Sequence, residues 1–276
     1  MAVTDHTDPE AFKAFELCGW DKVSGPYHDH FGPVTRQSVA PLLDAAAVGP
    51  GVRLLDVATG PGYAAAAAAE RGAEVIAVDF SATQIKLAGT LYPSVTFQQG
   101  DAEALDFADA SFDALVANFG MLHFPRPERA MAEAHRVLRP TGRFAFTVWS
   151  MPDKAVGLGI VLKAVTEHGN MEVPLPPGPS FFRFSEADEC RRSLTEAGFI
   201  EVEVAEIPMV WMVPSAQAAF DAVRQATVRT GALLDAQAPE ALNSIRRAVA
   251  EGLGAYRRED HFAVPMSAVL ASAVKP

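Results

Sequence analysis

From residue 52 onward, apolar runs of strand length alternate with runs of helical composition. The segments between the strands are rich in good helix formers and end at glycine or proline. This alternation is typical of βαβ units, and it predicts an α/β fold with helices on both faces of a mostly parallel sheet. The strand-like runs cover residues 52–58, 74–80, 95–101, 112–119 and 142–149.

Three segments lie outside this repeat. Residues 1–50 read as helices that lead into the sheet, with an aromatic, histidine-rich turn at 20–32. Residues 151–184 include a loop at 170–182 whose prolines predict a stiff surface excursion. Residues 208–260 carry two more helical stretches. We expect all three segments to act as lids over the sheet.

The remaining C-terminal elements follow from local signals. A helix is predicted from Ser185, which stands where an N-cap residue would, to Gly198. An alternating run follows at 199–213, and a last strand is predicted at 262–276. These elements extend the sheet beyond the five strands of the repeat.

Composition and charge narrow the partners. The chain has 276 residues, 49% of them hydrophobic and 21% charged, which is typical of a globular protein with a sizeable core. The formal net charge of -11, with no cluster of lysine or arginine, argues against nucleic acid and against anionic membranes as partners. We expect a cytoplasmic protein, because no apolar segment has the length of about 20 residues that a bilayer requires. We also expect a monomer or a homodimer.

The cysteines and histidines predict no metal site. Cys18 and Cys190 are far apart in the sequence, and we expect two reduced thiols packed as small apolar groups. His28 and His30 alternate and would share a face on an extended segment, but no further ligand completes a zinc set.

The stretch LLDVATGPG, residues 54–62, ends a buried strand with an acid and a glycine turn. Gly60 and Gly62 allow a ligand to approach the backbone, and the next helix directs free N–H groups toward it. The relaxed dinucleotide pattern also fits, since Asp79 stands about 20 residues further on. Asp56 favours another ligand, because a carboxylate there opposes a pyrophosphate and attracts a cation.

Five motifs in order carry a family resemblance: LLDVATGPG, VIAVDFS, GDAEALDF, FDALVANFGMLHF and RVLRPTGRFAFTVW. Their sequence and spacing resemble class I S-adenosylmethionine-dependent methyltransferases, in particular the branch that includes ubiquinone and menaquinone C-methyltransferases. The resemblance covers residues 20–149 well. It implies a three-layer, doubly wound, mostly parallel seven-stranded sheet of the Rossmann-like methyltransferase type with helical lid insertions. It also implies one domain over 1–276, with a cofactor-binding core at 51–150.

The resemblance assigns the cofactor, S-adenosyl-L-methionine, to named positions. Asp79 has the place of the acid that takes both ribose hydroxyls. Asp101 and Ala102 match the pair that reads adenine, and Asp56 would support the positive end of the methionine portion, directly or through water. The other expected contacts are Ala58, Thr59, Gly60, Gly62, Phe80, Gln84 and Asn118. Ala58 departs from the usual first glycine of the motif.

Methyl transfer needs an aligned acceptor and, where that acceptor keeps its proton, a general base. His123 follows the fourth strand, and imidazole ordinarily titrates near neutral pH, which suits a base. A structural histidine that packs the loop is an equal alternative. Tyr27 and His28 are second candidates, because the N-terminal segment of relatives folds over the cofactor.

The acceptor is expected to be a small apolar or aromatic molecule, because aromatic residues and methionines gather in the predicted lids. Arg183, beside Phe181 and Phe182, would pair with an anionic group on the acceptor. The alternative is an ordinary surface arginine.

Two alternative functions stay open: a protein of this fold that binds the cofactor without methylating, and an NAD(P)-dependent oxidoreductase. The oxidoreductase should lack the GDAEALDF adenine motif.

Overall fold

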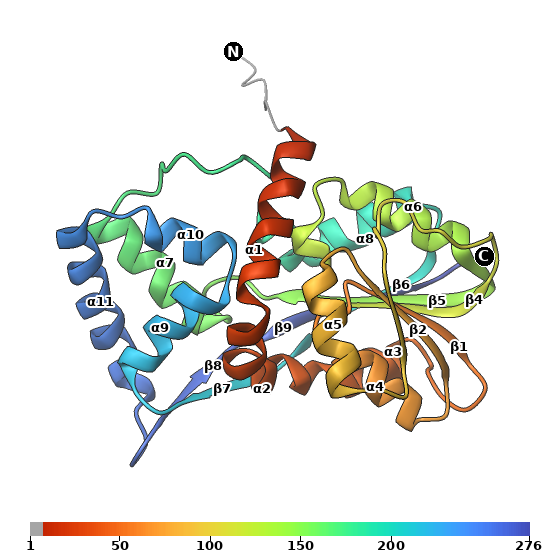
Figure 1. Ribbon diagram of the computed structural model, residues 1–276, viewed down its shortest axis with the longest axis horizontal. Coiled ribbons are helices and arrows are strands. Elements are labelled where there is room, and N and C mark those ends of the chain that lie inside the picture. Colours follow the sequence, from red (N-terminus) through yellow and green to blue (C-terminus); the bar gives the residue numbers. More distant parts are fainter. Residues whose placement is uncertain (1–7) are drawn as a thin grey trace.

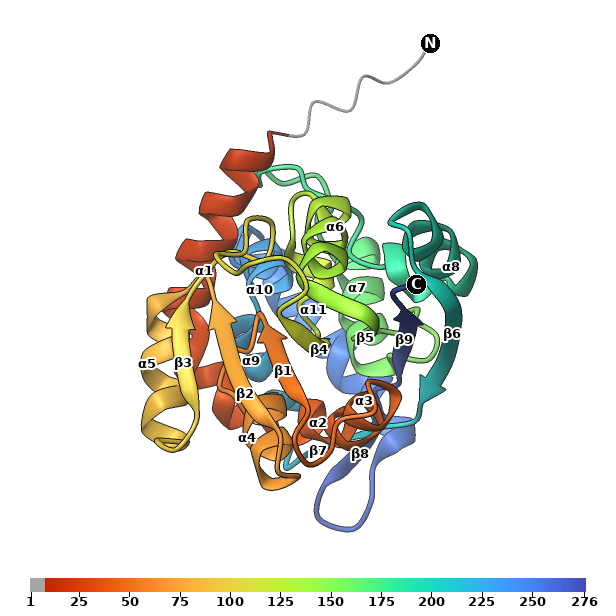
Figure 2. The same ribbon diagram turned by 90° about the vertical axis from the view of Figure 1, so that its right-hand side faces the viewer.

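The computed structural model describes residues 8–276, so the first seven residues of the predicted N-terminal lid, His6 included, lie outside the described part. A seven-stranded sheet runs through it in the order β3-β2-β1-β4-β5-β9-β6 (Figure 2). Only β9 runs antiparallel to its neighbours β5 and β6. The predicted α/β fold class is therefore confirmed. The strands are β1 (Arg53–Val57), β2 (Glu74–Asp79), β3 (Thr96–Gln99), β4 (Phe112–Asn118), β5 (Leu138–Trp149), β6 (Ile200–Ile207) and β9 (Ala268–Val274).

Helices cover both faces of this sheet. Helices α3 (Val39–Ala45), α4 (Tyr63–Glu70) and α5 (Ala82–Leu91) lie on one face, and α6 (Pro127–Val137) and α8 (Ala187–Glu196) on the other (Figure 2). Crossovers between parallel strands are right-handed, so the helices change face where the strand order reverses between β1 and β4. The alanines of α4 bring its axis close to the sheet.

A second group of helices stands beside the sheet, with the long helix α1 between the two (Figure 1). Two helical stretches are predicted within 208–260, but the structure has three. The predicted last strand is likewise divided, because β8 pairs with β7 in a separate ribbon before β9 joins the sheet. The elements here are α7 (Val156–His168), β7 (Val210–Val213), α9 (Ala216–Ala226), α10 (Arg229–Asp235), α11 (Pro239–Leu253) and β8 (Phe262–Pro265).

Helix α1 (Pro9–His30) corrects the largest error of the sequence interpretation. The predicted turn at 20–32 is wrong, since the helix continues through Pro26. Proline removes one helical hydrogen bond, and tertiary packing offsets that loss. A Cβ on Gly19 would lie 2.3 Å from Val228, which shows how closely α1 approaches the α9–α10 connection.

Two predicted boundaries also move. Strand β5 begins at Leu138, earlier than predicted, and its register with β4 shifts after Phe112. Helix α8 begins at Ala187 without a side-chain cap, because the hydroxyl of Ser185 donates instead to the carbonyl of Trp149. Five short helical turns complete the described chain: α2 (Gly32–Thr35), η1 (Arg36–Ser38), η2 (Met121–His123), η3 (Arg183–Ser185) and η4 (Gly254–Tyr256).

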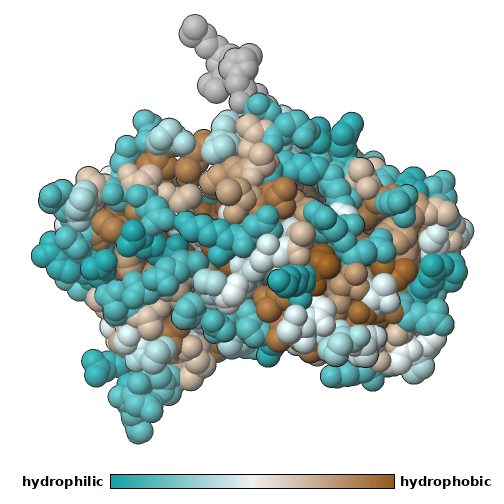
Figure 3. Space-filling view, in the orientation of Figure 1, coloured by the Kyte–Doolittle hydropathy of each residue, from teal (hydrophilic) through white to brown (hydrophobic). Residues whose placement is uncertain are grey.

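Apolar side chains are largely internal. The face seen in Figure 3 is predominantly hydrophilic, with apolar atoms in scattered patches. Within residues 8–276, no helix is both long and apolar enough to cross a bilayer. Cys18 and Cys190 are free thiols, and Cys190 is buried as expected. The prediction of a packed thiol is wrong for Cys18, which is exposed on α1.

Candidate active site

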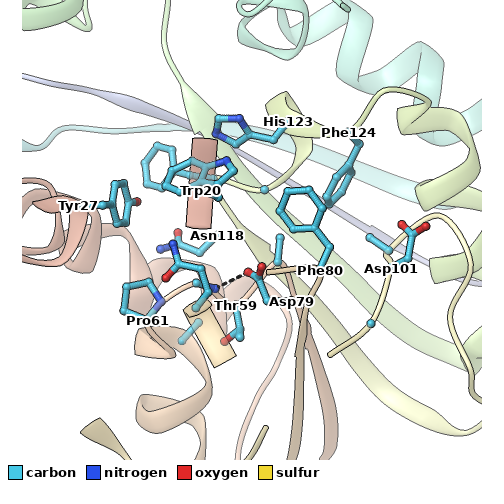
Figure 4. Close-up of a pocket in the computed structure, with 18 of the residues that line it drawn as sticks. Trp20, Tyr27, Thr59, Pro61, Asp79, Phe80, Asp101, Asn118, His123 and Phe124 are labelled. Atoms are coloured by element: carbon cyan, nitrogen blue, oxygen red, sulfur yellow. Dashed lines mark hydrogen bonds between the residues drawn. The ribbon is translucent and has the colours of Figure 1, made fainter. Parts of the chain in front are cut away.

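A cleft lies where β1, β2 and β4 end, at the edge where parallel α/β sheets bind ligands. It holds about 850 Å³ of space between atoms, part of it open solvent. Helix α1 contributes Lys13, Trp20 and Tyr27 to one wall, at positions seven residues apart that share a helix face. Figure 4 shows Asp79 near the centre, with Trp20 and His123 on one side and Phe80 and Phe124 toward Asp101.

The turn after β1 forms the floor of the cleft. Ala58, Gly60 and Gly62 all have positive φ angles, of 51°, 53° and 86°. Alanine adopts this left-handed conformation at a cost of about 1–2 kcal/mol, which explains why the usual residue at position 58 is glycine. Ala58, Thr59 and Gly60 line the cleft. The turn thus brings backbone close to any ligand bound there.

Gly62 has a packing role instead. It does not line the cleft, and a Cβ at this position would lie 2.8 Å from the ring of Phe97. We expect Gly62→Ala to destabilise the fold by at least about 1–2 kcal/mol, because the left-handed angle alone costs that much. Urea unfolding measures the change. Gly89→Ala is the control: it lies in α5 with nothing within 4 Å of an added Cβ, and should stabilise by about 0.5–1 kcal/mol.

Asp79 ends β2 with its carboxylate in the cleft. Its two oxygens accept hydrogen bonds from the backbone N–H groups of Gly60 and Ser81, both at 2.9 Å. Each carboxylate oxygen can accept a further bond, so the group can take two hydroxyls of a ligand. Burial raises the pKa of Asp79 to about 6, against the opposing effect of the two N–H donors. The group is therefore mostly ionised at neutral pH.

Asp56 does not line the cleft, contrary to a direct contact with the cofactor. It is fully buried behind the turn, where one oxygen accepts from the Thr59 hydroxyl at 2.6 Å and from the Ala65 N–H at 3.1 Å. Burial raises the pKa of Asp56 to about 7. Asp56 thus connects the turn to α4. Because it is buried behind the turn and its pKa is raised, its negative charge attracts a cationic ligand less than the sequence indicates.

The far end of the cleft contains Phe80, Gln84, Asp101 and Ala102, as the resemblance implies. Asp101 forms an ion pair with Lys13 and also accepts from the Glu103 N–H at 3.0 Å. The sequence interpretation missed Lys13. Its seven-residue spacing from Trp20 and Tyr27 was a usable signal, but the prediction of a turn at 20–32 obscured it.

Asn118 ends β4 and lines the cleft from below. Its side-chain oxygen accepts from the hydroxyls of Ser38 and Thr147, both at 2.7 Å. Its amide donates to the carbonyl of Thr35 at 3.3 Å. This network fixes the orientation of Asn118 and joins the end of the sheet to the N-terminal helices.

His123 lies in η2 and is held from α1. Its Nδ1 lies 3.0 Å from Oε2 of Glu16, which also accepts from the indole N–H of Trp20 at 3.1 Å. Glu16 is fully buried. A carboxylate accepts only, so Nδ1 carries the proton, and a neutral imidazole in this orientation would have its lone pair on Nε2. The sequence interpretation missed Glu16, which is 107 residues away from His123 in the chain.

A second cavity adjoins the cleft on the side of His123. This aromatic pocket holds about 470 Å³ and shares Trp20, Tyr27, Phe119 and His123 with the cleft. Phe31, Trp149 and Phe181 add further rings, and Arg229 is among its polar residues. Apolar walls with a few polar groups are typical of small-molecule sites.

Three residues lie in positions that do not suit their predicted roles: His28 and Tyr27 as general bases, and Arg183 as a partner of an anionic acceptor. His28 is absent from both cavities and is bonded to the Tyr63 hydroxyl at 2.8 Å. Tyr27 lines both cavities, but burial raises its pKa to about 12, which leaves it protonated and unsuited as a base. Arg183 forms ion pairs with Glu128 and Glu189, both at 2.6 Å, and lines neither cavity.

Comparisons with known proteins agree with this architecture. Residues 55–146 match a family model described as a methyltransferase domain. A demethylmenaquinone methyltransferase of Renibacterium salmoninarum is 40% identical over 111 residues, which are 40% of this chain and 47% of that protein. The matched region thus spans about half the length of this curated relative.

Solved structures show the same fold at lower identity. A putative methyltransferase from Bacillus halodurans is 22% identical with a TM-score of 0.54, over 86% of this chain and 98% of that one. The [4+2]-cyclase SpnF is 22% identical with a TM-score of 0.52, over 87% of this chain and 80% of that one. A shared fold does not by itself determine the reaction. Residues 55–146 of this chain therefore match a methyltransferase domain, and the fold of the described residues is that of solved methyltransferase structures.

Proposed function

We propose that this protein uses S-adenosylmethionine to methylate a small aromatic molecule. The observation that carries the proposal is the junction of the two cavities at Trp20, Tyr27, Phe119 and His123. A nucleoside cofactor in the cleft and an acceptor in the aromatic pocket would meet there. In-line displacement depends mainly on alignment and on exclusion of water, and an enclosed junction of this kind provides both.

In this proposal each cleft residue has a defined role. The ionised Asp79 accepts the two ribose hydroxyls, and Asp101 accepts from the adenine amine while the Ala102 N–H donates to the ring. Because Lys13 is already paired with Asp101, the adenine amine would bind to the lone pairs of the Asp101 carboxylate that Lys13 leaves free. Phe80 and Gln84 flank the base. The residues left for the methionine portion are Ala58, Thr59, Gly60 and Asn118.

The tautomer of His123 determines which of its atoms can accept a proton from the acceptor. S-adenosylmethionine bound in the cleft would supply an activated methyl group to the acceptor and would be released as S-adenosylhomocysteine. Where the attacking atom carries a proton, Nε2 of His123 takes it. Glu16 is a positioning residue that holds the imidazole through Nδ1 and stabilises the imidazolium that forms.

The lids are part of the proposal. Helix α1 covers the cleft with three side chains, and the loop 170–182 packs on it so tightly that a Cβ on Gly178 would lie 2.2 Å from Phe12. Movement of α1 or of this loop would therefore admit ligands. We propose a small molecule rather than a nucleic acid as acceptor, because the net charge is -11.

A demethylmenaquinone methyltransferase acts, by its name, on a quinone-type ring, and the aromatic pocket here suits such a ring. The test has two steps. Calorimetry should show binding of S-adenosylhomocysteine and none of NADH; the reverse would favour the oxidoreductase. Formation of S-adenosylhomocysteine is then measured over phenols, amines and quinone precursors. Cofactor binding without turnover on any acceptor would point to a protein that binds the cofactor without methylating.

A further inference from the structure

Arg229 is a cation without a polar partner in the aromatic pocket. Among residues 8–276, its guanidinium makes no hydrogen bond or ion pair, and its Nη1 is fully shielded from solvent. Its closest described neighbours are rings, with the guanidinium carbon 5.2 Å from the centre of Phe12 and 5.5 Å from that of Phe181. These contacts stabilise the charge without satisfying its N–H donors. Arg229 is only partly buried, so Nη1 is the nitrogen that lacks both solvent and a partner among the described residues.

Leaving such a group unpaired is costly. Burial lowers the pKa of Arg229, although the charge of Glu16 opposes this effect. Glu16 does not neutralise it by contact, because the two side chains form no ion pair. Oε2 of Glu16 binds His123 and Trp20, and its Oε1 has no partner among the described residues. Buried charges in proteins are normally paired. The pocket therefore contains a charged N–H donor, Nη1 of Arg229, that an anionic ligand could pair with.

The surroundings of Arg229 restrict what that anion is. The pocket is walled by rings, among them Trp20, Phe31 and Trp149, which suits an aromatic ligand. His123 faces the same space from the cleft side. A guanidinium fork matches the two oxygens of a carboxylate better than a single phenolate oxygen.

We propose that Arg229 binds a carboxylate of the methyl acceptor, so that the acceptor is an aromatic acid. This inference rests on the proposed function and narrows its substrate class. The ring lies in the aromatic pocket, the carboxylate pairs with Arg229, and the atom to be methylated faces the cleft beside His123. Arg229 sets specificity and takes no part in the transfer step.

Binding of acid and amide pairs tests this without turnover. Calorimetry compares benzoate with benzamide and 2-naphthoate with 2-naphthamide, on protein saturated with S-adenosylhomocysteine. The wild type should prefer an acid over its amide by about tenfold or more, as hydrogen bonds to a charged group imply. Arg229→Gln should abolish the preference, and Arg229→Lys should keep part of it because the charge remains while the fork is lost.

Arg224→Gln is the matched control, since Arg224 lies on the neighbouring helix α9, pairs with Asp235 at 2.6 Å and does not line the aromatic pocket. Its acid preference should equal that of the wild type. No preference in the wild type for either pair, or an equal preference in Arg229→Gln, overturns the inference and leaves Arg229 as a counter-charge for Glu16. If Arg229→Gln does not fold, the wild type and Arg229→Lys still decide. Failure of S-adenosylhomocysteine to bind would instead overturn the proposed function.

Discussion

Replacing His123 with alanine should lower turnover by about 100-fold or more, with little change in affinity for S-adenosylhomocysteine. Removal of a general base typically has this effect, provided that the acceptor carries a proton at the attacked atom. The structure supports the role, because Nδ1 is held by Glu16 and the ring lines both cavities. The measurement is single-turnover methyl transfer together with calorimetry of the product complex.

Glu16 provides the discriminating variant. Glu16→Gln should lower the rate less than His123→Ala, and the double variant should be no slower than His123→Ala, because residues that act as a unit are not additive. A rate for His123→Ala within a few-fold of wild type would make the histidine a packing residue.

Two other histidines serve as controls. His261→Ala should leave the rate unchanged, since His261 is paired with Asp260 and lines neither cavity. His28→Ala tests the second candidate base directly. We expect a small effect, because His28 itself lines neither cavity and is hydrogen-bonded to the hydroxyl of Tyr63.

Replacing Asp79 with asparagine should weaken cofactor binding by about 1.5–3 kcal/mol, roughly 10- to 150-fold, as expected for hydrogen bonds to a charged group. Asp79 also supports the turn through Gly60 and Ser81, so a loss of affinity alone is ambiguous. The ligand resolves this. The wild type should prefer S-adenosylhomocysteine over its 2′-deoxyribose analogue, and Asp79→Asn should lose that preference. An equal loss for both ligands would assign Asp79 to the turn.

The same carboxylate predicts a pH dependence. Its pKa is raised to about 6 in the free protein, and only the ionised form accepts both hydroxyls fully. Affinity for S-adenosylhomocysteine should therefore fall as the pH drops below about 6, and Asp79→Asn should remove this component. Calorimetry of both proteins between pH 5 and 8 measures the difference, roughly within the range where the group titrates.

The raised pKa values of Asp56 and Asp79 also determine how the stability of the fold changes with pH. Asp56 and Asp79 bind protons more tightly in the folded protein, with pKa values of about 7 and 6, than in the unfolded chain. The contribution of these two groups to stability therefore grows as the pH falls from above 7 toward their unfolded values near 4. Asp56→Asn and Asp79→Asn should each flatten this part of the profile.

Local sequence determined the core and the cofactor side of the site. Strand periodicity, the glycine turn and the acid at the end of β2 are short-range signals, and they placed Asp79, Gly60 and Asp101 at the edge where parallel strands end. Right-handed crossovers leave few alternatives for such a sheet. The errors in the predicted strands are small. Strand β5 begins earlier than predicted, because the hydrophobic pattern does not show the shift in its register with β4.

Tertiary structure alone decided the aromatic pocket. Pro26 reads locally as a helix breaker, yet α1 continues through it because packing against other elements outweighs the lost hydrogen bond. That continuity places Tyr27 on the same helix face as Lys13 and Trp20 over the cleft. The same helix joins Glu16 to His123, 107 residues away. Arg229 reaches the same space from a third part of the chain. Periodicity carries no information on such distant pairings, because they depend on how separately formed elements pack.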